Sequence, residues 1–288
     1  MIKPEDVTII IPHLGGSPEA EYALNECIKS LMETTPQIKR IVSLNGEKCS
    51  SDEHLDFNEK PFKQITIEDQ GQCKAVNAAA ATVNTPWIFV TNDDMVYAPG
   101  WFEKLVFTAN GEEMPVGCVS PQLVEPRLGA PTFLVEFCGG AGGDFDKNKW
   151  LKFAEWHNKE VGYSRDLRTG FNLPFLISKE LWDTVGGYDI NYDPWGSNSD
   201  SDLEYKIKLA GVQPYQNTNC LVYHFSQTSG TFHPDNQGAW QKNWDYFIQK
   251  WGFPRTDIGI WEANFKIPTV GEGRVYTPKW EGKYESNY

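Results

Sequence analysis

Apolar residues in the first half of the chain form short continuous runs that alternate with segments of helical periodicity. Val7 to Ile11 is a β-branched run closed by Pro12, as expected for a buried strand that ends where proline removes a backbone donor. From about Pro18 to Thr34 the apolar residues recur at helical spacing and predict an amphipathic helix. The same reasoning predicts two further strands and an alanine-rich helix: Ile38 to Leu44, Phe62 to Ile67 and Gln72 to Val83. Strands that alternate with helices predict an α/β fold whose central sheet is mostly parallel and flanked by helices.

The segment from Trp87 to Met95 joins an apolar strand to a cluster of oxygen-bearing side chains, Asn92-Asp93-Asp94. Ligands of open α/β sheets bind at the carboxyl ends of strands. Carboxylates crowded there repel one another unless a cation offsets them, and hard oxygen ligands favour magnesium or manganese. A plain solvated turn is the alternative, because Asn and Asp also favour turns.

The second half of the chain repeats this combination of apolar runs and acidic residues. A helix is expected at Trp101 to Phe107, strands at Val116 to Ser120 and Phe171 to Ile177, and a helix from Ser178 to Gly186. A loop is expected at the glycine-rich patch 138–143, because no strand-to-helix context surrounds it as in a phosphate cradle.

A second acidic patch, Ser199-Asp200-Ser201-Asp202, opens a predicted helix that ends at Gly211. Capping explains acidic residues at a helix start, but Asp200 and Asp202 cannot both be the cap. Residues two apart point to different faces, so one carboxylate could cap while the other faces a cleft and takes a proton from an incoming hydroxyl. His224 lies on an apolar strand, where a hydrogen-bonded structural histidine and a metal ligand are both open interpretations.

Composition narrows the classes of function. The chain has 288 residues, of which 40% are apolar and 14% aromatic, enough for one large domain or two tightly joined halves. Its 26 basic and 39 acidic residues give a formal charge of −13, which argues against nonspecific nucleic-acid binding. No apolar run approaches the roughly 20 residues of a membrane helix, and no signal core is present at the start, so we expect a soluble cytoplasmic protein. The six cysteines are scattered without a Cys-x-x-Cys pair and are expected to be reduced packing residues.

Two common nucleotide-binding motifs are missing from the sequence. The dinucleotide fingerprint Gly-x-Gly-x-x-Gly does not follow the first strand, and no Gly-x-x-x-x-Gly-Lys-Ser/Thr loop occurs. Dehydrogenase and P-loop functions are therefore disfavoured.

Taken in order, five features resemble the inverting family-two glycosyltransferases of the GT-A fold. They are Ile9-Ile10-Ile11-Pro12; Gly71 with Asn77; Asn92-Asp93-Asp94 followed by Pro99-Gly100-Trp101; Gly186-Gly187-Tyr188-Asp189 followed by Ser199-Asp200-Ser201-Asp202-Leu203; and Lys250-Trp251-Gly252. The resemblance covers about Val7 to Gly252. It implies a nucleotide-sugar-binding half at 1–115, an acceptor-binding and catalytic half at 116–252, and a C-terminal extension at 253–288.

The resemblance also implies roles for individual residues. Asp94 and His224 would bind manganese or magnesium, and Asp200 would be the catalytic base that deprotonates a hydroxyl of a glycan or similar acceptor. The remaining donor-binding assignments follow the family's motifs and loops: Pro12, His13, Asn45, Asp69, Gly71, Lys74, Asn92 and Asp93. Acceptor binding is expected at Trp195, because it lies close to Asp200, and at Asp202. Lys74 is expected to assist at the diphosphate.

Three positions depart from the family pattern. Asn92 and Ser199 stand where the family usually has carboxylates, and Leu44 stands where an aspartate often contacts the nucleotide base. A catalytically silent carbohydrate- or nucleotide-binding module is therefore a competing prediction. A sugar nucleotidyltransferase is a further alternative, but its glycine- and arginine-rich loop after the first strand is absent.

Acceptor recognition is expected between about Gln122 and Phe171, where aromatic residues could stack on sugar rings or pack in the core. The candidates are Trp150, Trp156, His157 and Tyr163.

Overall fold

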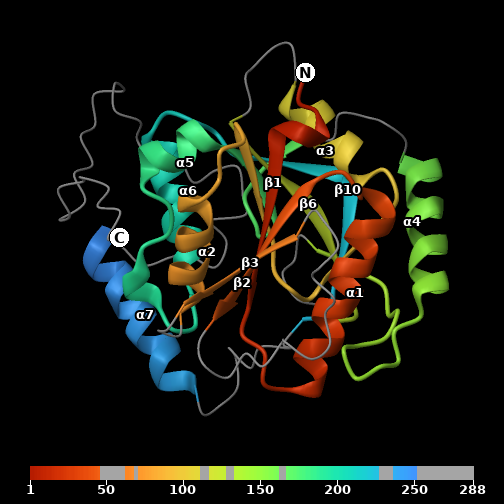
Figure 1. Ribbon diagram of the computed structural model, residues 1–288, viewed down its shortest axis with the longest axis horizontal. Coiled ribbons are helices and arrows are strands. Elements are labelled where there is room, and N and C mark those ends of the chain that lie inside the picture. Colours follow the sequence, from red (N-terminus) through yellow and green to blue (C-terminus); the bar gives the residue numbers. More distant parts are fainter. Residues whose placement is uncertain are drawn as a thin grey trace.

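The computed structural model describes residues 1–45, 62–67, 71–110, 117–127, 133–161, 167–226 and 236–251. They form a three-layer α/β arrangement in which helices cover both faces of one twisted sheet (Figure 1). The strands are β1 (Val7–His13), β2 (Lys39–Asn45), β3 (Phe62–Ile67), β4 (Trp87–Val90), β5 (Met95–Tyr97), β6 (Cys118–Glu125), β7 (Leu134–Val135), β8 (Leu167–Thr169), β9 (Phe175–Ser178) and β10 (Tyr215–His224).

The helices are α1 (Pro18–Thr34), α2 (Gln72–Ala81), α3 (Trp101–Ala109), α4 (Lys147–Val161), α5 (Lys179–Val185), α6 (Ser199–Leu209) and α7 (Gln237–Trp251), with short 3-10 turns η1 (Pro4–Asp6) and η3 (Ile190–Tyr192). Helices α2, α5, α6 and α7 lie on one side of the sheet and α1, α3 and α4 on the other (Figure 1). None of the described helices is long and apolar enough to cross a bilayer.

The sheet order β3-β2-β1-β4-β9-β6-β10-β5 brings the two sequence halves into one sheet. Strands β1 to β4 are parallel, and β9 runs antiparallel to both β4 and β6. Strands β6 and β10 therefore run in the same direction as β1 and β4, and their carboxyl ends share one edge of the sheet. This is the edge at which α/β proteins bind ligands.

Most predicted elements are present, with shifted ends. The helices expected at 18–34 and 101–107 are confirmed, whereas the strand expected at Phe171 to Ile177 begins only at Phe175, after the cis bond between Leu173 and Pro174. The strand expected at Val116 to Ser120 extends to Glu125. This extension places a carboxylate at the ligand edge of the sheet.

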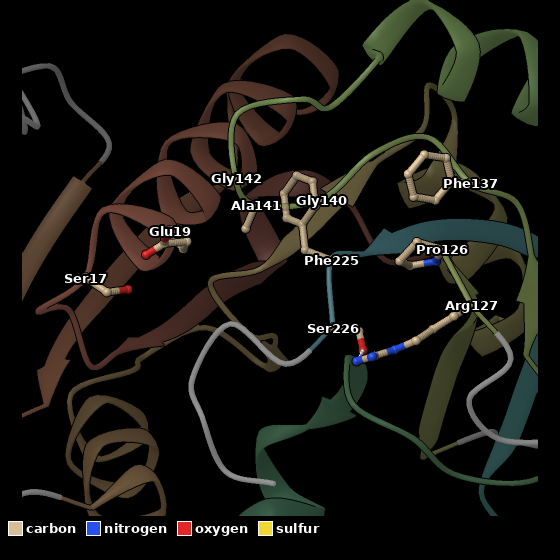
Figure 2. Close-up of a pocket in the computed structure, with 10 residues that line it drawn as sticks. All are labelled: Ser17, Glu19, Pro126, Arg127, Phe137, Gly140, Ala141, Gly142, Phe225 and Ser226. Atoms are coloured by element: carbon tan, nitrogen blue, oxygen red, sulfur yellow. Dashed lines mark hydrogen bonds between the residues drawn. The ribbon is translucent and has the colours of Figure 1, made fainter. Parts of the chain in front are cut away.

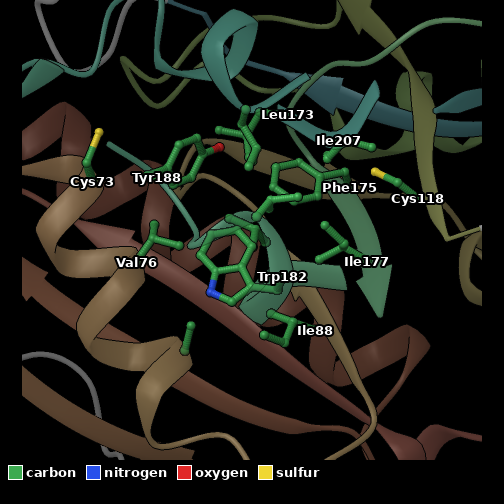
Figure 3. Close-up of a cluster of buried hydrophobic side chains, with 14 of the residues drawn as sticks. Cys73, Val76, Ile88, Cys118, Leu173, Phe175, Ile177, Trp182, Tyr188 and Ile207 are labelled. Atoms are coloured by element: carbon green, nitrogen blue, oxygen red, sulfur yellow. The ribbon is translucent and has the colours of Figure 1, made fainter. Parts of the chain in front are cut away.

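A buried aromatic cluster packs the sheet against α2 and α5. Trp182 lies between Val76 of α2 and Phe175 of β9, and the ring of Tyr188 meets Trp182 edge to face at 5.7 Å (Figure 3). Burying each such side chain contributes about 2–3 kcal/mol. This core fixes the position of α2, which follows the carboxyl end of β3, and of Tyr188.

Helix α7 was not predicted from the sequence. Its apolar residues Phe247 and Trp251 are fully buried against Tyr205 of α6, at centroid separations of 5.3 and 5.0 Å. Helix α7 therefore packs directly on the helix that begins with the second acidic patch.

Candidate functional site

The carboxyl ends of β1, β4, β6 and β10 gather carboxylates and imidazoles in one place. Asp93 and Asp94 follow β4, His13 ends β1, Glu125 ends β6 and His224 ends β10. Hydrogen bonds and ion pairs connect these side chains in two groups, Asp93 with His13 and Asp94 with His224 and Glu125. The predicted convergence of Asp93, Asp94 and His224 is thus present in the structure.

His13 holds Asp93 in place from β1. Its Nδ1 lies 2.6 Å from Asp93 Oδ2, and its Nε2 lies 3.3 Å from Glu21 Oε1 on α1. Burial lowers the pKa of His13, but Asp93 and Glu21 outweigh it and raise the pKa overall. Because His13 is only 1% exposed, it acts on any bound molecule through Asp93.

His224 lies between two carboxylates. Its Nδ1 is 2.7 Å from Glu125 Oε1 and its Nε2 is 3.2 Å from Asp94 Oδ2. Burial lowers the pKa of His224, but Asp94 and Glu125 raise it to about 10 overall. The bond to Glu125 fixes the ring so that Nε2 points at Asp94, the arrangement in which a carboxylate orients a metal-binding histidine.

The donor set at Asp94 and His224 fits a divalent cation. Both side chains are largely buried and a carboxylate oxygen and an imidazole nitrogen lie close enough to bind one ion. Within the described part of the chain, no three His, Cys, Asp or Glu side chains group so as to hold a metal by themselves. Magnesium and manganese are commonly bound by one or two protein side chains together with substrate phosphate oxygens, which matches this pair.

The first turn of α2 contacts both Asn92, which precedes the two aspartates after β4, and Asp193, in the loop before the second acidic patch. Gln72 Nε2 donates to Asn92 Oδ1 at 3.3 Å. The amides of Cys73 and Lys74 donate to Asp193 Oδ1 and Oδ2 at 2.8 and 3.0 Å. A carboxylate from more than a hundred residues away thus caps α2, a role the sequence analysis missed.

Gly71 makes this close approach possible. A Cβ at this position would lie 2.3 Å from Asp193 Oδ2, so a side chain would push the capping carboxylate away. The predicted donor-binding residue Gly71 therefore has a packing role. Lys74 extends the same turn and is half-buried.

Asp200 is positioned by Tyr188. Tyr188 donates its hydroxyl proton to Asp200 Oδ1 at 2.7 Å, and its backbone exchanges two hydrogen bonds with the Asn77 side chain of α2, at 2.8 and 2.9 Å. Burial and then the charge of Asp200 raise the pKa of Tyr188 well above its ordinary value, so the phenol stays protonated. Gly187 has φ +64, and a Cβ there would lie 2.7 Å from Asn77 Oδ1. The Gly186-Gly187-Tyr188 segment thus positions the carboxylate of Asp200.

Asp202 does not face the cleft, so its prediction as an acceptor-binding residue is wrong. The side chain is fully buried and accepts from Trp251 Nε1 at 2.9 Å and from Lys250 Nζ at 2.7 Å. Asp200 and Asp202 point to different faces of α6, as expected, but the face that bears Asp202 packs on α7. The N-cap of α6 is Asn198, so neither acidic residue is the cap.

The remaining predicted donor- and acceptor-binding residues differ in burial, and some lie partly or wholly outside the described residues. Pro12 is buried within β1, and Trp195 is half-buried in the loop before α6. Asn45 ends β2, with a side chain outside the described residues, and Asp69 lies outside them altogether.

Two of the four aromatic residues predicted to bind the acceptor are core residues. Trp150 is fully buried and His157 is 7% exposed, so both pack in the interior, whereas Trp156 is 55% exposed. Tyr163 and the predicted extension 253–288 lie outside the described residues. Cys27, Cys73, Cys118, Cys138 and Cys220 are buried free thiols, as expected.

Comparison with known proteins agrees with this geometry. Residues 8–130 match the model of glycosyl transferase family 2. These residues carry a family 2 glycosyltransferase domain. Its fold is that of the GT-A transferases, as predicted. No curated protein sequence matches the chain.

Two solved structures resemble the family 2 domain and its continuation. GalNAc-T7, described with UDP, GalNAc and Mn2+, has a TM-score of 0.54 at 16% identity over 85% of this chain. The mannosyltransferase PcManGT from Pyrobaculum calidifontis, described with GDP-Man and Mn2+, has a TM-score of 0.52 at 15% identity over 89%. The chain spans 50% of the length of GalNAc-T7 and 69% of that of PcManGT.

Proposed function

We propose that the protein is a metal-dependent glycosyltransferase that moves a sugar from a nucleotide-diphosphate donor to a hydroxyl acceptor with inversion. The observation that carries this proposal is the placement of Asp94 and His224 at one sheet edge, where the start of α2 contacts both Asn92 and Asp193, in the loop that leads to Asp200. The acceptor is a glycan or a similar hydroxyl compound.

Asp94 and His224 would hold a magnesium or manganese ion, with Glu125 orienting the histidine. When bound, the ion would stabilise negative charge on the donor's phosphates as a Lewis acid. Both solved relatives are described with Mn2+, which supports this expectation. Asp93 is assigned to the donor's ribose and diphosphate, in an orientation set by His13.

Asp200 is assigned the role of catalytic base. It would take the proton of the acceptor hydroxyl as that oxygen attacks the anomeric carbon from the face opposite the diphosphate. The bond from Tyr188 restricts the carboxylate to one orientation, which favours proton transfer because geometry limits that step. Trp195 precedes α6 and is assigned to the acceptor side.

The carboxyl ends of β1, β2 and β3 and the start of α2 are assigned to the nucleotide. Pro12, Asn45, Gly71, Lys74 and, after β4, Asn92 are also assigned to the nucleotide, and the assignment of Asp69 rests on the sequence alone. The amide side chain of Asn92 accepts from Gln72, which supports a role in fixing the start of α2.

A thermal-shift panel tests the donor site. UDP, GDP, CDP, dTDP and their sugar conjugates would each be added with and without Mn2+, because a ligand that binds the native state raises its stability. The proposal predicts a shift with one nucleotide that requires the metal. No shift with any nucleotide would contradict the transferase and favour the silent binding module that Asn92 and Ser199 suggest.

A further inference from the structure

A groove of about 570 Å³ opens beside the carboxyl ends of β6 and β10. Pro126 and Arg127 follow β6 directly, and Phe225 and Ser226 follow β10 directly. The backbone amide of Phe225 donates to the carbonyl of Asp94 at 3.0 Å. The groove therefore begins one residue beyond His224, next to the proposed metal-binding pair.

The walls of the groove come from two further elements. Ser17 and Glu19 at the start of α1 form one wall, and the glycine-rich segment 140–142 with Phe137 forms the other (Figure 2). Phe225 is 3% exposed, whereas Phe137 is 60% exposed. A large aromatic ring held in water beside a cavity is a feature of ligand-binding surfaces.

The chemistry of the lining favours a carbohydrate. A sugar ring presents an apolar face, which suits an exposed aromatic ring, and hydroxyls at its edge, which suit Arg127, Glu19 and the two serines. Arg127 Nη2 already donates to Ser226 Oγ at 3.2 Å, so the guanidinium lies along the groove (Figure 2). The formal charges of Arg127 and Glu19 cancel, which favours a neutral saccharide over a second anionic nucleotide. Pockets of roughly 300–1,000 Å³ accommodate small ligands.

We infer that this groove binds the sugar units of an oligosaccharide acceptor that lie beyond the unit receiving the transferred sugar. This inference rests on the proposed function for the placement of the reacting unit near Asp200. It assigns Phe137 the role of a stacking platform and Arg127 that of a hydrogen-bond donor, and it makes longer neutral acceptors better ligands than single sugars.

Ligand-detected NMR with a defined saccharide panel tests the inference. The probes are the mono-, di- and tetrasaccharides of glucose, galactose, mannose and N-acetylglucosamine. At least one tetrasaccharide should bind more tightly than its monosaccharide, and Phe137→Ala should weaken that binding about tenfold, from loss of the aromatic contact and its buried area. Phe107→Ala is the matched control, because Phe107 is 61% exposed on α3 and does not line the groove.

The inference is overturned if no saccharide in the panel binds, if tetrasaccharides bind no better than monosaccharides, or if Phe137→Ala binds as the wild type does. An equal loss in Phe107→Ala would also overturn it. The metal-dependent nucleotide shift, measured on the same variants, separates this outcome from failure of the proposed function. Saccharide binding without a thermal shift from any nucleotide would contradict the proposed transferase function and would leave the groove as a glycan-binding site.

Discussion

Replacing Lys250 with methionine should destabilise the protein strongly, because this lysine neutralises two buried carboxylates. Its Nζ lies 2.6 Å from Asp189 Oδ2 and 2.7 Å from Asp202 Oδ1, and the residue is 5% exposed. Methionine keeps most of the side-chain length and removes the charge. The two carboxylates would stay in the interior with hydrogen bonds but without their closest cation.

The expected loss is large relative to the stability of a domain. Removing one partner of a buried ion pair costs about 3–5 kcal/mol, against a typical total of about 5–15 kcal/mol. Donors that remain at the carboxylates, Trp251 Nε1 at 2.9 Å from Asp202 and Tyr246 OH at 2.9 Å from Asp189, offset part of the charge. We therefore expect Lys250→Met to lower the free energy of unfolding by about 3 kcal/mol or more.

Urea unfolding followed by tryptophan fluorescence measures this loss. Lys159→Met is the control, because Lys159 and Glu155 form an exposed helical pair, and we expect no measurable change there. The double variant Lys250→Met with Asp202→Asn should recover part of the loss, since it removes one of the uncompensated charges.

The loss should also depend on pH. Burial raises the pKa of Asp189, but the charge of Lys250 outweighs it and lowers the pKa overall. A lowered native pKa gives stability that is present above about pH 4 and is lost as the pH falls below it. Without Lys250, the largest influence that lowers the native pKa of Asp189 is gone, so this pKa rises relative to the wild type and the stability lost in the variant shrinks as the pH falls towards 4. This reasoning would be refuted if Lys250→Met lost less than about 1 kcal/mol of unfolding free energy at pH 7, or if that loss grew as the pH fell.

Three further predictions concern the site itself. Gly71→Ala should lower the free energy of unfolding in urea by about 1–2 kcal/mol, because the added Cβ displaces the capping carboxylate of Asp193. Gly238→Ala is the control and should cost no stability, because a Cβ at Gly238 meets open space. Equal effects of the two substitutions would contradict the capping role of Asp193. Glu125→Gln should weaken Mn2+ binding in the presence of nucleotide roughly tenfold or more by calorimetry, and unchanged affinity would contradict its role in orienting His224. Tyr188→Phe should lower kcat about tenfold with little change in donor KM, through loss of the bond to Asp200, and an unchanged kcat would contradict it.

The fold and one part of the site could be predicted from the sequence because their signals are local. Continuous apolar runs marked the strands, and the Asn92 to Asp94 patch followed a strand directly, so the sheet's geometry placed it at the ligand edge. The order of the family motifs supplied the expectation that His224 meets Asp94, and the structure places the two 3.2 Å apart.

Contacts between distant segments could not be predicted in this way. Asp193 caps α2 across 120 residues, and Glu125 meets His224 across 99, and neither separation leaves a periodic signal. Asp202 was assigned to the cleft because helix α7 was missed, and α7 decides which face of α6 is buried. The apolar residues at helical spacing in α7, Trp240, Trp244, Phe247 and Trp251, were the available signal.

The most direct test of the central claim compares turnover and donor binding in Asp200→Asn. Release of nucleoside diphosphate from the donor that the thermal-shift panel identifies would be measured in the presence of Mn2+ and an acceptor. Asp183→Asn on the exposed side of α5 serves as the control. Turnover by Asp200→Asn should fall on the order of a hundredfold or more, while the metal-dependent nucleotide shift stays as in the wild type. Turnover at the wild-type rate would show that Asp200 is not the base.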